Sequence, residues 1–259
     1  MKKLALTSLL AFAAVSSASA ANFMIGNPMY RPDKGVFYNE TTFTMDNELE
    51  HYALGTEFGY GFYDWWTVSV ATAGSYDSGD MPHEGMESSK WNWDYVELGL
   101  NYRWFDYGNE WKGDIYGTVA QAYDARDNLT IQYYDWTVGT RYGYVVDGFS
   151  LNAVAEAHNY SLNRHAWGME AGLEGQVWLG HHFNIVGGVL YGFNLDHADK
   201  NAYYGGDYGY YSSDPINVKL GFNYNFCKGS YVGIFGQKNV RSGINVDPVE
   251  FGAKFGIQF

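Results

Sequence analysis

Ionisable residues recur at even spacings in several parts of this chain. Glu156 and His158 are two residues apart, and Glu170 and Glu174 are four residues apart. In an extended strand, residues separated by an even number of positions point to the same side. Each such segment would therefore place carboxylates, ammonium groups or an imidazole on one face, where they could pair with one another or interact with ions and polar solutes.

Acidic residues also gather between the expected strands, without forming a known binding motif. Asp77, Asp80, Glu84 and Glu87 lie within residues 77–92, and their oxygen atoms could chelate Ca²⁺. However, the sequence has no twelve-residue calcium-loop pattern, no Gly-rich phosphate loop, no Cys/His metal spacing and no nucleotide motif. We therefore expect no bound metal and no cofactor.

A tyrosine-rich segment, residues 196–214, is a further place with recognisable chemistry. Its tyrosines are separated by glycines and are Tyr203, Tyr204, Tyr208, Tyr210 and Tyr211. Their aromatic faces could stack on sugars or fold inward as a constriction. The alternative is a surface loop with aromatic side chains at its rim.

Twelve segments have the alternation, and roughly the ~10-residue length, of a membrane-crossing strand. In residues 215–226, for example, apolar side chains occupy the even positions from 216, and polar residues or glycine occupy the odd positions from 217. Ten strands remain an alternative, because the first and the eleventh segments alternate less cleanly. The twelve segments are 35–46, 50–62, 66–76, 93–105, 111–123, 130–145, 148–160, 167–179, 182–195, 215–226, 230–240 and 249–259.

The connections alternate between tight turns and longer links, as in barrels that cross a membrane. With an even number of strands, both ends of the chain fall on the tight-turn side. The sequence therefore predicts an all-β fold, a single antiparallel up-and-down transmembrane β-barrel over residues 35–259. The tight turns are expected at 63–65, 106–110, 146–147, 180–181 and 227–229, and the longer links at 47–49, 77–92, 124–129, 161–166, 196–214 and 241–248.

The last eleven residues alternate without exception and end on an aromatic residue. Every odd-numbered residue from Val249 to Phe259 is apolar, and every even-numbered one is polar or glycine. This closing strand resembles that of bacterial outer-membrane β-barrel proteins, the general porin-like superfamily, without pointing to a subfamily. The resemblance implies residence in the outer membrane among lipids and lipopolysaccharide, and it implies that Phe259 is a signal read by the barrel-assembly machinery.

Some outer-membrane barrels are hydrolases, and a few residues of this chain are of the types that such enzymes use. His158, Asn159 and Ser161 lie close together, but adjacent residues of an extended strand point apart and do not form a triad. We therefore predict that the chain has no catalytic residues and is not an enzyme. A hydrolase remains a third alternative, after a channel and a plugged barrel. Two pairs resemble weakly the acidic and histidine pairs of omptin-type proteases: Asp77/Asp80 and Asp196-His197.

The N-terminus has the three parts of a secretory signal peptide. Two lysines precede an apolar stretch, residues 4–15, and Ala18-Ser19-Ala20 is an A-x-A cleavage site. The apolar stretch is too short to cross a bilayer as a helix. We therefore expect a signal peptide over residues 1–20, cleavage between Ala20 and Ala21, and a periplasmic lead-in over residues 21–34. In the alternative reading, this lead-in is a short piece tucked into the barrel.

The composition agrees with a membrane barrel and excludes other classes. Aromatic residues make up 19% of the chain, including 24 Tyr and 9 Trp, and aromatic girdles at both bilayer interfaces account for such a content. The single cysteine, Cys227, excludes a disulfide scaffold. The formal net charge of −13 argues against a nucleic-acid partner and disfavours anionic solutes.

If the apolar phase of each strand faces lipid, the opposite phase faces the interior of the barrel. Most charges fall on that second phase, which supports the assignment because Lys or Arg facing lipid near the bilayer midplane costs roughly 2–4 kcal/mol. Besides Glu40, the residues expected to line the lumen are Glu57, Glu97, Arg103, Lys112, Asp114, Asp135, Arg141, Glu156, His158, Glu170, Glu174, Lys219, Glu250 and Lys254.

Two functions fit such an interior. The first is a narrow channel for small polar or cationic solutes, since twelve strands give an interior between the filled eight-stranded and the open sixteen-stranded case. The second is a plugged structural or adhesive barrel without transport, in which Glu97, Arg103, Asp135 and Arg141 satisfy one another. Replacing both arginines with alanine would barely change the stability of an open channel, but it would lower the melting temperature of a plugged barrel.

Overall fold

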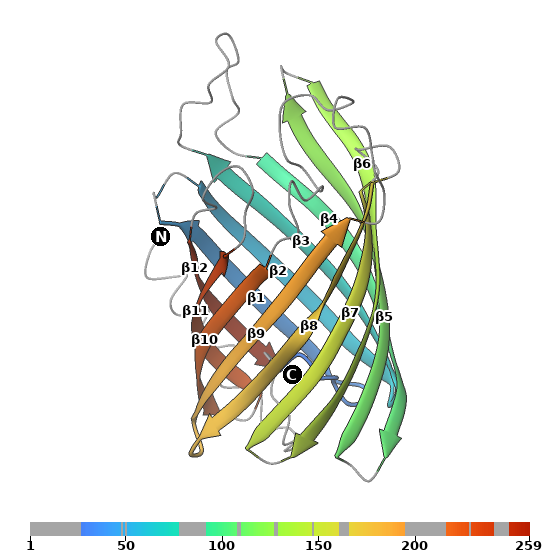
Figure 1. Cartoon of the computed structure of the whole chain (residues 1–259), viewed down its shortest axis with the longest axis vertical. Helices are drawn as coiled ribbons and strands as arrows, with labels where there is room; N and C mark the ends of the chain where they lie inside the picture. Colours follow the sequence, from blue (N-terminus) through green and yellow to red (C-terminus); the bar gives the residue numbers. More distant parts are fainter. Residues whose placement is uncertain are drawn as a thin grey trace.

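The chain folds into one closed barrel of antiparallel strands (Figure 1). The computed structural model describes residues 27–47, 49, 51–77, 92–107, 110–126, 129–146, 148–160, 166–194, 216–227, 229–240 and 249–259. The strands are β1 (Phe37–Asp46), β2 (His51–Tyr63), β3 (Trp66–Asp77), β4 (Asn92–Tyr107), β5 (Trp111–Arg126), β6 (Leu129–Val146), β7 (Phe149–Tyr160), β8 (Ala166–Leu179), β9 (Phe183–Asn194), β10 (Ile216–Cys227), β11 (Ser230–Asn239) and β12 (Glu250–Gln258).

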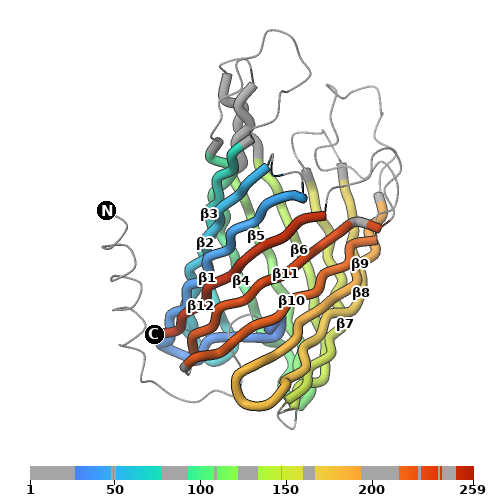
Figure 2. The backbone as a smooth tube through the Cα atoms, turned by 90° about the vertical axis from the view of Figure 1, so that its left-hand side faces the viewer, coloured from blue at the N-terminus to red at the C-terminus, as the bar shows by residue number. Residues whose placement is uncertain are grey.

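Each strand pairs with its neighbours in sequence, and β12 pairs with β1, so the sheet has no free edge (Figure 2). The seam is extended by two backbone hydrogen bonds between Phe37 and Phe259, each 2.9 Å long. The predicted twelve-strand barrel is confirmed, and the ten-strand alternative is wrong. Within the described ranges, no helix is long and apolar enough to span a membrane.

The strand boundaries lie within three residues of the predicted ones. The largest difference is at the link expected over 124–129, where β5 and β6 stay paired as far as Arg126 and Leu129. Backbone hydrogen bonds continue this hairpin past the end of the apolar pattern, because the ladder does not depend on side-chain polarity. Three of the tight turns contain a glycine with positive φ, namely Gly148, Gly180 and Gly229.

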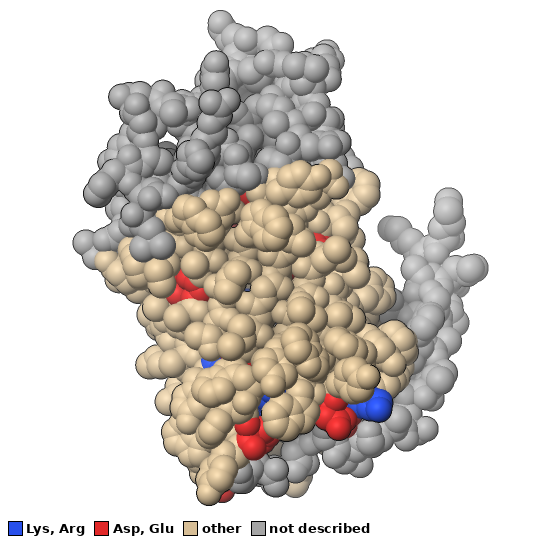
Figure 3. Space-filling model, turned by 90° about the vertical axis from the view of Figure 1, so that its right-hand side faces the viewer, with Lys and Arg blue, Asp and Glu red and all other residues tan. Residues whose placement is uncertain are grey.

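The outer face of the barrel is apolar, and most of the charged side chains of the strands face inward. Leu98 and Val138 are more than half exposed on the outside, whereas Asp114 is 0% and Arg103 9% exposed on the inside. Figure 3 shows an exterior made mostly of residues other than Lys, Arg, Asp and Glu. This distribution is the reverse of that in a water-soluble protein, and it fits a barrel surrounded by lipid.

Exposed aromatic side chains form two girdles on this outer face, as expected at the two bilayer interfaces. The girdle near the tight turns contains Phe37, Tyr63, Trp65, Trp104, Tyr107, Trp111, Phe149, Phe183 and Phe259. The girdle near the opposite end contains Trp93, Tyr134, Trp136, Trp167 and Tyr191.

Residues 27–34 enter the barrel at its tight-turn end. Met29 is 0% and Tyr30 6% exposed, and Tyr30 packs with Tyr38 and Tyr231 of the barrel wall. Within the expected lead-in of residues 21–34, the described part therefore follows the alternative reading and is tucked into the barrel. The signal peptide of residues 1–20 and the cleavage at Ala20 and Ala21 lie outside the described residues and stay predictions.

Gly61 of β2 makes room for this internal segment. Lys34 forms a parallel bridge with Gly61, and the amide of Gly35 donates to the carbonyl of Gly61 at 2.7 Å. A Cβ atom at Gly61 would lie 2.3 Å from the Asp33 carbonyl oxygen, much closer than van der Waals contact. The segment can follow the wall at this place only because the residue is glycine.

Candidate functional site

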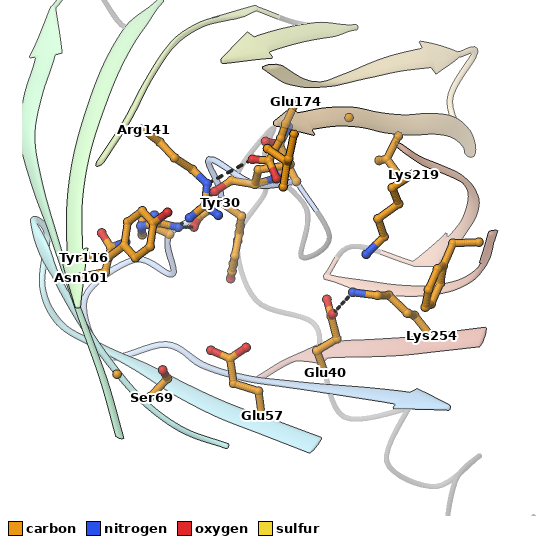
Figure 4. Close-up of a pocket in the computed structure, with 18 of the residues that line it drawn as sticks. Tyr30, Glu40, Glu57, Ser69, Asn101, Tyr116, Arg141, Glu174, Lys219 and Lys254 are labelled. Carbon is orange, nitrogen blue, oxygen red and sulfur yellow. Dashed lines mark hydrogen bonds and ion pairs between the residues drawn. The ribbon is translucent and has the colours of Figure 1, made fainter. Parts of the chain in front are cut away.

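The barrel encloses a cavity of about 890 Å³ whose wall is formed by the strands and by the internal segment (Figure 4). Seven of the predicted lumen residues line this cavity, together with Glu40. They are Glu57, Glu97, Arg141, Glu174, Lys219, Glu250 and Lys254.

Two ion pairs hold opposite sides of the cavity wall. Arg141 Nε of β6 lies 3.1 Å from Glu174 Oε2 of β8, and the Arg141 guanidinium stacks over the Tyr116 ring at 4.4 Å. On the other side, Lys254 Nζ of β12 lies 2.5 Å from Glu40 Oε1 of β1. Figure 4 shows both pairs pointing into the cavity. The first pair joins β6 to β8, which are not neighbours, and the second joins β12 to β1 at the seam of the barrel. Both pairs therefore stabilise the barrel and also place charges on the cavity wall.

Carboxylates form a row along the wall made by the first four strands. Glu40 of β1 is the cross-strand partner of Glu57 of β2, which is paired with Ala71 of β3, and Ala71 is paired with Glu97 of β4. Lys219 projects from β10, which lies six strands from β4 around the ring. The ammonium group of Lys219 lies 4.5 Å from the centre of the Phe235 ring. Glu40, at one end of this row, is paired with Lys254 and lies on the side of Lys219, whereas Glu57 and Glu97 lie farther from both lysines.

The internal segment is anchored by polar contacts to both sides of the barrel. Asn27 Nδ2 donates to Gln176 Oε1 at 2.6 Å and to Ser150 Oγ at 3.1 Å. Arg31 NH2 lies 2.9 Å from Asp114 Oδ2. Burial lowers the pKa of Arg31 to about 10, opposed by the charge of Asp114. Arg31 is therefore still protonated at neutral pH, and the ion pair is present.

Three predicted lumen residues, Arg103, Lys112 and Asp114, do not line the cavity, and the arginine and the aspartate contact the internal segment. Arg103 Nε donates to Asp114 Oδ1 at 2.9 Å, and Arg103 NH2 donates to the carbonyl of Met29 at 2.7 Å. Lys112 Nζ bonds Asp106 at 3.0 Å. All these side chains face inward as predicted. However, Arg103 pairs with Asp114, and Arg141 pairs with Glu174. The prediction that Glu97, Arg103, Asp135 and Arg141 pair with one another is therefore wrong for both arginines.

A bulge in β4 brings Asp106, which was predicted to lie in a turn, onto the inner face of the barrel. The register between β4 and β5 shifts between Arg103 and Phe105, so one extra residue, Trp104, is accommodated on the outside. After the bulge, Asp106 is paired with Lys112 and lies on the inner face. Strict alternation from Arg103 would place Asp106 on the outer face. The contact between Asp106 and Lys112 therefore follows only from the register of β4 against β5.

The remaining predicted lumen residues lie on the inner face of β6, β7 and β8. His158 Nε2 is 3.1 Å from Glu156 Oε1, and Glu156 is paired across the sheet with Glu170. Asp135 is half-buried and precedes Thr137, the cross-strand partner of His158, by two residues. None of these four residues belongs to the described cavity lining.

Most of the loop residues considered for hydrolysis or calcium binding lie outside the described residues. They are Asp80, Glu84, Glu87, Ser161, Asp196 and His197, and the tyrosines of 196–214 lie there as well. His158 faces the interior and bonds Thr137 Oγ1 and Glu156. Asn159, the next residue of the strand, is paired across the sheet with Trp167 and with the outward-facing Trp136.

Several cavity residues were missed from the sequence, and most of them are aromatic or lie on the internal segment. Tyr38 and Tyr116 share the inward phase of Glu40 and Asp114, which was a usable signal. In β11, both phases carry apolar residues, because Tyr231 and Phe235 face inward while Val232 and Ile234 face outward. This explains the poor alternation of that strand. Arg31 had no signal, since its segment does not alternate.

Comparison with known proteins identifies the fold. No family model matches the chain, and no curated protein matches its sequence. Among solved structures, the NanC porin is 9% identical with a TM-score of 0.58, over 85% of this chain and 98% of that one. The COG4313 outer membrane channel from Pseudomonas putida F1 is 13% identical with a TM-score of 0.57, over 92% and 100%. The KdgM porin is 8% identical with a TM-score of 0.55, over 86% and 99%.

At these identities the likeness is one of fold. The fold is that of outer-membrane porins and channels, and this agrees with the apolar exterior and the aromatic girdles. The chain therefore has the fold of outer-membrane β-barrels, which agrees with the prediction made from its closing strand.

Proposed function

We propose that this protein is a channel for small polar solutes across the outer membrane. The observation that carries the proposal is the cavity of about 890 Å³ inside a closed barrel, whose wall includes nine inward Lys, Arg and Glu side chains. Small barrels that serve only as scaffolds fill their interior with packed side chains. A polar space within an apolar exterior instead gives a polar solute an environment that the bilayer does not offer. The porin and channel structures with the same fold support this reading.

The charges on the cavity wall favour neutral or zwitterionic solutes over cations. Four positive groups project inward against five negative ones, so most of the acidic excess of the whole chain does not extend to the cavity. A solute that carries both charges, or a strong dipole, meets the carboxylates of Glu57 and Glu97 on one part of the wall and the ammonium group of Lys219 on another. The inward positive groups are Arg31, Arg141, Lys219 and Lys254, and the negative groups are Glu40, Glu57, Glu97, Glu174 and Glu250.

The internal segment supports a second candidate, a barrel that is closed at its tight-turn end and does not transport. Residues 27–34 reach across the interior, from Ser150 and Gln176 on one side to Tyr38 and Gly61 on the other. In the channel reading, the same segment narrows the path and sets an upper limit on solute size. The two candidates therefore differ in whether any solute passes while the segment is seated.

Liposome swelling tests the proposed solute class. The mature chain is refolded into liposomes, which are then diluted into isotonic sugars of increasing size or into the zwitterion glycine. We expect swelling with glycine and with the smallest sugars, decreasing as the sugar grows. We also expect a reversal potential near zero in a KCl gradient, because the inward charges on the wall nearly balance.

Two variants of similar size provide a matched comparison. Lys219→Gln removes a positive group and shifts the reversal potential toward cation preference, whereas Glu97→Gln shifts it toward anion preference. Strong cation selectivity of the wild type would contradict the proposed solute class. Failure of every solute to cause swelling would contradict the channel itself.

A further inference from the structure

A cluster of three metal-ligating side chains lies on the inner face of β7 and β8, outside the described cavity lining. Glu156 and His158 are successive inward residues of β7, and Glu170 is the cross-strand partner of Glu156. One ligand atom from each residue lies within 4.8 Å of the other two. We propose that these three side chains bind a divalent transition-metal ion of the zinc class.

The distances suit such an ion after a small side-chain movement. Tetrahedral zinc with bonds of about 2.0–2.2 Å places its ligand atoms roughly 3.3 Å apart. His158 Nε2 and Glu156 Oε1 are already 3.1 Å apart. Glu170 needs to approach by at most roughly 1.5 Å, which a rotation of its flexible side chain provides. Three protein ligands leave one coordination position for water or a solute on the interior side.

Each of the three side chains also has a hydrogen-bond partner on another strand. Thr137 Oγ1 of β6 is 3.1 Å from His158 Nδ1. If Nδ1 carries the proton and donates to this hydroxyl, the lone pair of Nε2 is directed toward the two carboxylates. Such outer partners fix the tautomer and ring orientation of a metal-binding histidine.

The carboxylates are positioned in the same way. The Tyr116 hydroxyl of β5 donates to Glu156 Oε2, which leaves Oε1 on the side of His158. Asn217 Nδ2 of β10 donates to Glu170 Oε1 at 3.3 Å and holds that carboxylate over the interior. Partners from three further strands thus orient the three side chains toward one another.

The charges and the donor types indicate which ion fits. Two carboxylates directly opposite each other in adjacent strands repel, and a divalent cation between them would offset that repulsion. Calcium and magnesium prefer oxygen ligands alone, whereas imidazole with carboxylates suits zinc and its neighbours such as cobalt and nickel. A zinc-class ion is therefore expected to bind, and calcium is not.

Calorimetric titration with zinc chloride tests the site on the tag-free mature chain, refolded in detergent and first stripped with a chelator. We expect one ion per chain with a dissociation constant in the micromolar range or below. His158→Gln and Glu170→Gln should each weaken binding at least tenfold, and Thr137→Val should weaken it about tenfold by releasing the imidazole. A calcium titration should give no heat of binding.

The double variant His181→Gln/His182→Gln is the matched control. These adjacent histidines follow β8, and they are the most obvious competing place for zinc among the described residues. The control should bind zinc as the wild type does. Absence of zinc binding, unchanged affinity in folded His158→Gln and Glu170→Gln, or loss of binding in the control alone would each overturn the proposal. The titration does not depend on conductance. The proposed channel function could therefore be contradicted while the proposed metal site is confirmed.

Discussion

Arg103 shows how an interior charge can be structural even in a barrel with a polar cavity. Its guanidinium bonds both oxygens of Asp114, at 2.9 and 3.2 Å, and also the carbonyl of Met29. Asp114 is 0% exposed. The inward direction of both residues followed from alternation in the sequence. Their partnership did not, because it depends on the register of β4 against β5 and on the position of the internal segment.

We expect Arg103→Ala to lower the free energy of unfolding by about 3 kcal/mol, because it leaves a buried carboxylate with one cation fewer. The loss stays at the lower end of the 3–5 kcal/mol typical of broken buried pairs, since Arg31 still pairs with Asp114. Urea unfolding in lipid vesicles measures it. This revises the open-channel expectation that replacing Arg103 and Arg141 leaves stability unchanged.

Lys238→Ala is the control for that measurement. Lys238 borders the cavity from the outward phase of β11, and the described part of the chain gives it no ion pair. Its replacement removes a cation of similar length without leaving a buried carboxylate unpaired. An effect of Arg103→Ala no larger than that of Lys238→Ala would show that the Asp114 pair contributes nothing to folding.

At the scale of the strands, the sequence was most informative where one face meets lipid and the other meets polar groups. In β10 and β12 the alternation located the strand and its inward residues, including Lys219 and Lys254. It was least informative in β11, where aromatic residues also face inward, and near Trp104, where a bulge shifts the phase. Inward apolar residues and an extra residue in a strand both interrupt the alternation of apolar and polar positions. Neither feature can therefore be predicted from that alternation.

The closing strand β12 gives a prediction about assembly. We expect Phe259→Ala to reduce the amount of barrel in the outer membrane much more than it reduces the stability of the folded barrel. The alanine variant keeps both backbone hydrogen bonds to Phe37, and the half-exposed ring contributes less than the ~1.5–3 kcal/mol of a fully buried one. A signal for the assembly machinery acts before folding is complete.

Quantitative immunoblotting of outer-membrane fractions at matched expression, combined with urea unfolding of the refolded variant, separates the two effects. Val232→Ala of β11, another outward apolar residue, is the control. Equal outer-membrane levels of wild type and Phe259→Ala would rule out the assembly role.

At the scale of the whole molecule, the strands, the cavity and the internal segment form one arrangement. Twelve strands enclose more space than their own inward side chains fill, and residues 27–34 occupy part of it at the tight-turn end. The barrel was predictable because every strand repeats the same pattern. The internal segment was not, because it has two prolines, no alternation and contacts that come from strands far away in the sequence.

Single-channel recording of the refolded wild type in planar bilayers, beside Gly61→Ala and Gly55→Ala, tests the central claim that this barrel conducts past its internal segment. A Cβ at Gly61 collides with the Asp33 carbonyl oxygen, whereas one at Gly55 of the same strand meets only ordinary contacts, the nearest at 3.6 Å. We predict discrete, stable conductance steps for the wild type, the same steps for Gly55→Ala, and larger steps for Gly61→Ala, whose segment is displaced. If the folded wild type and Gly61→Ala both fail to conduct, the channel account is contradicted and the barrel is a closed scaffold.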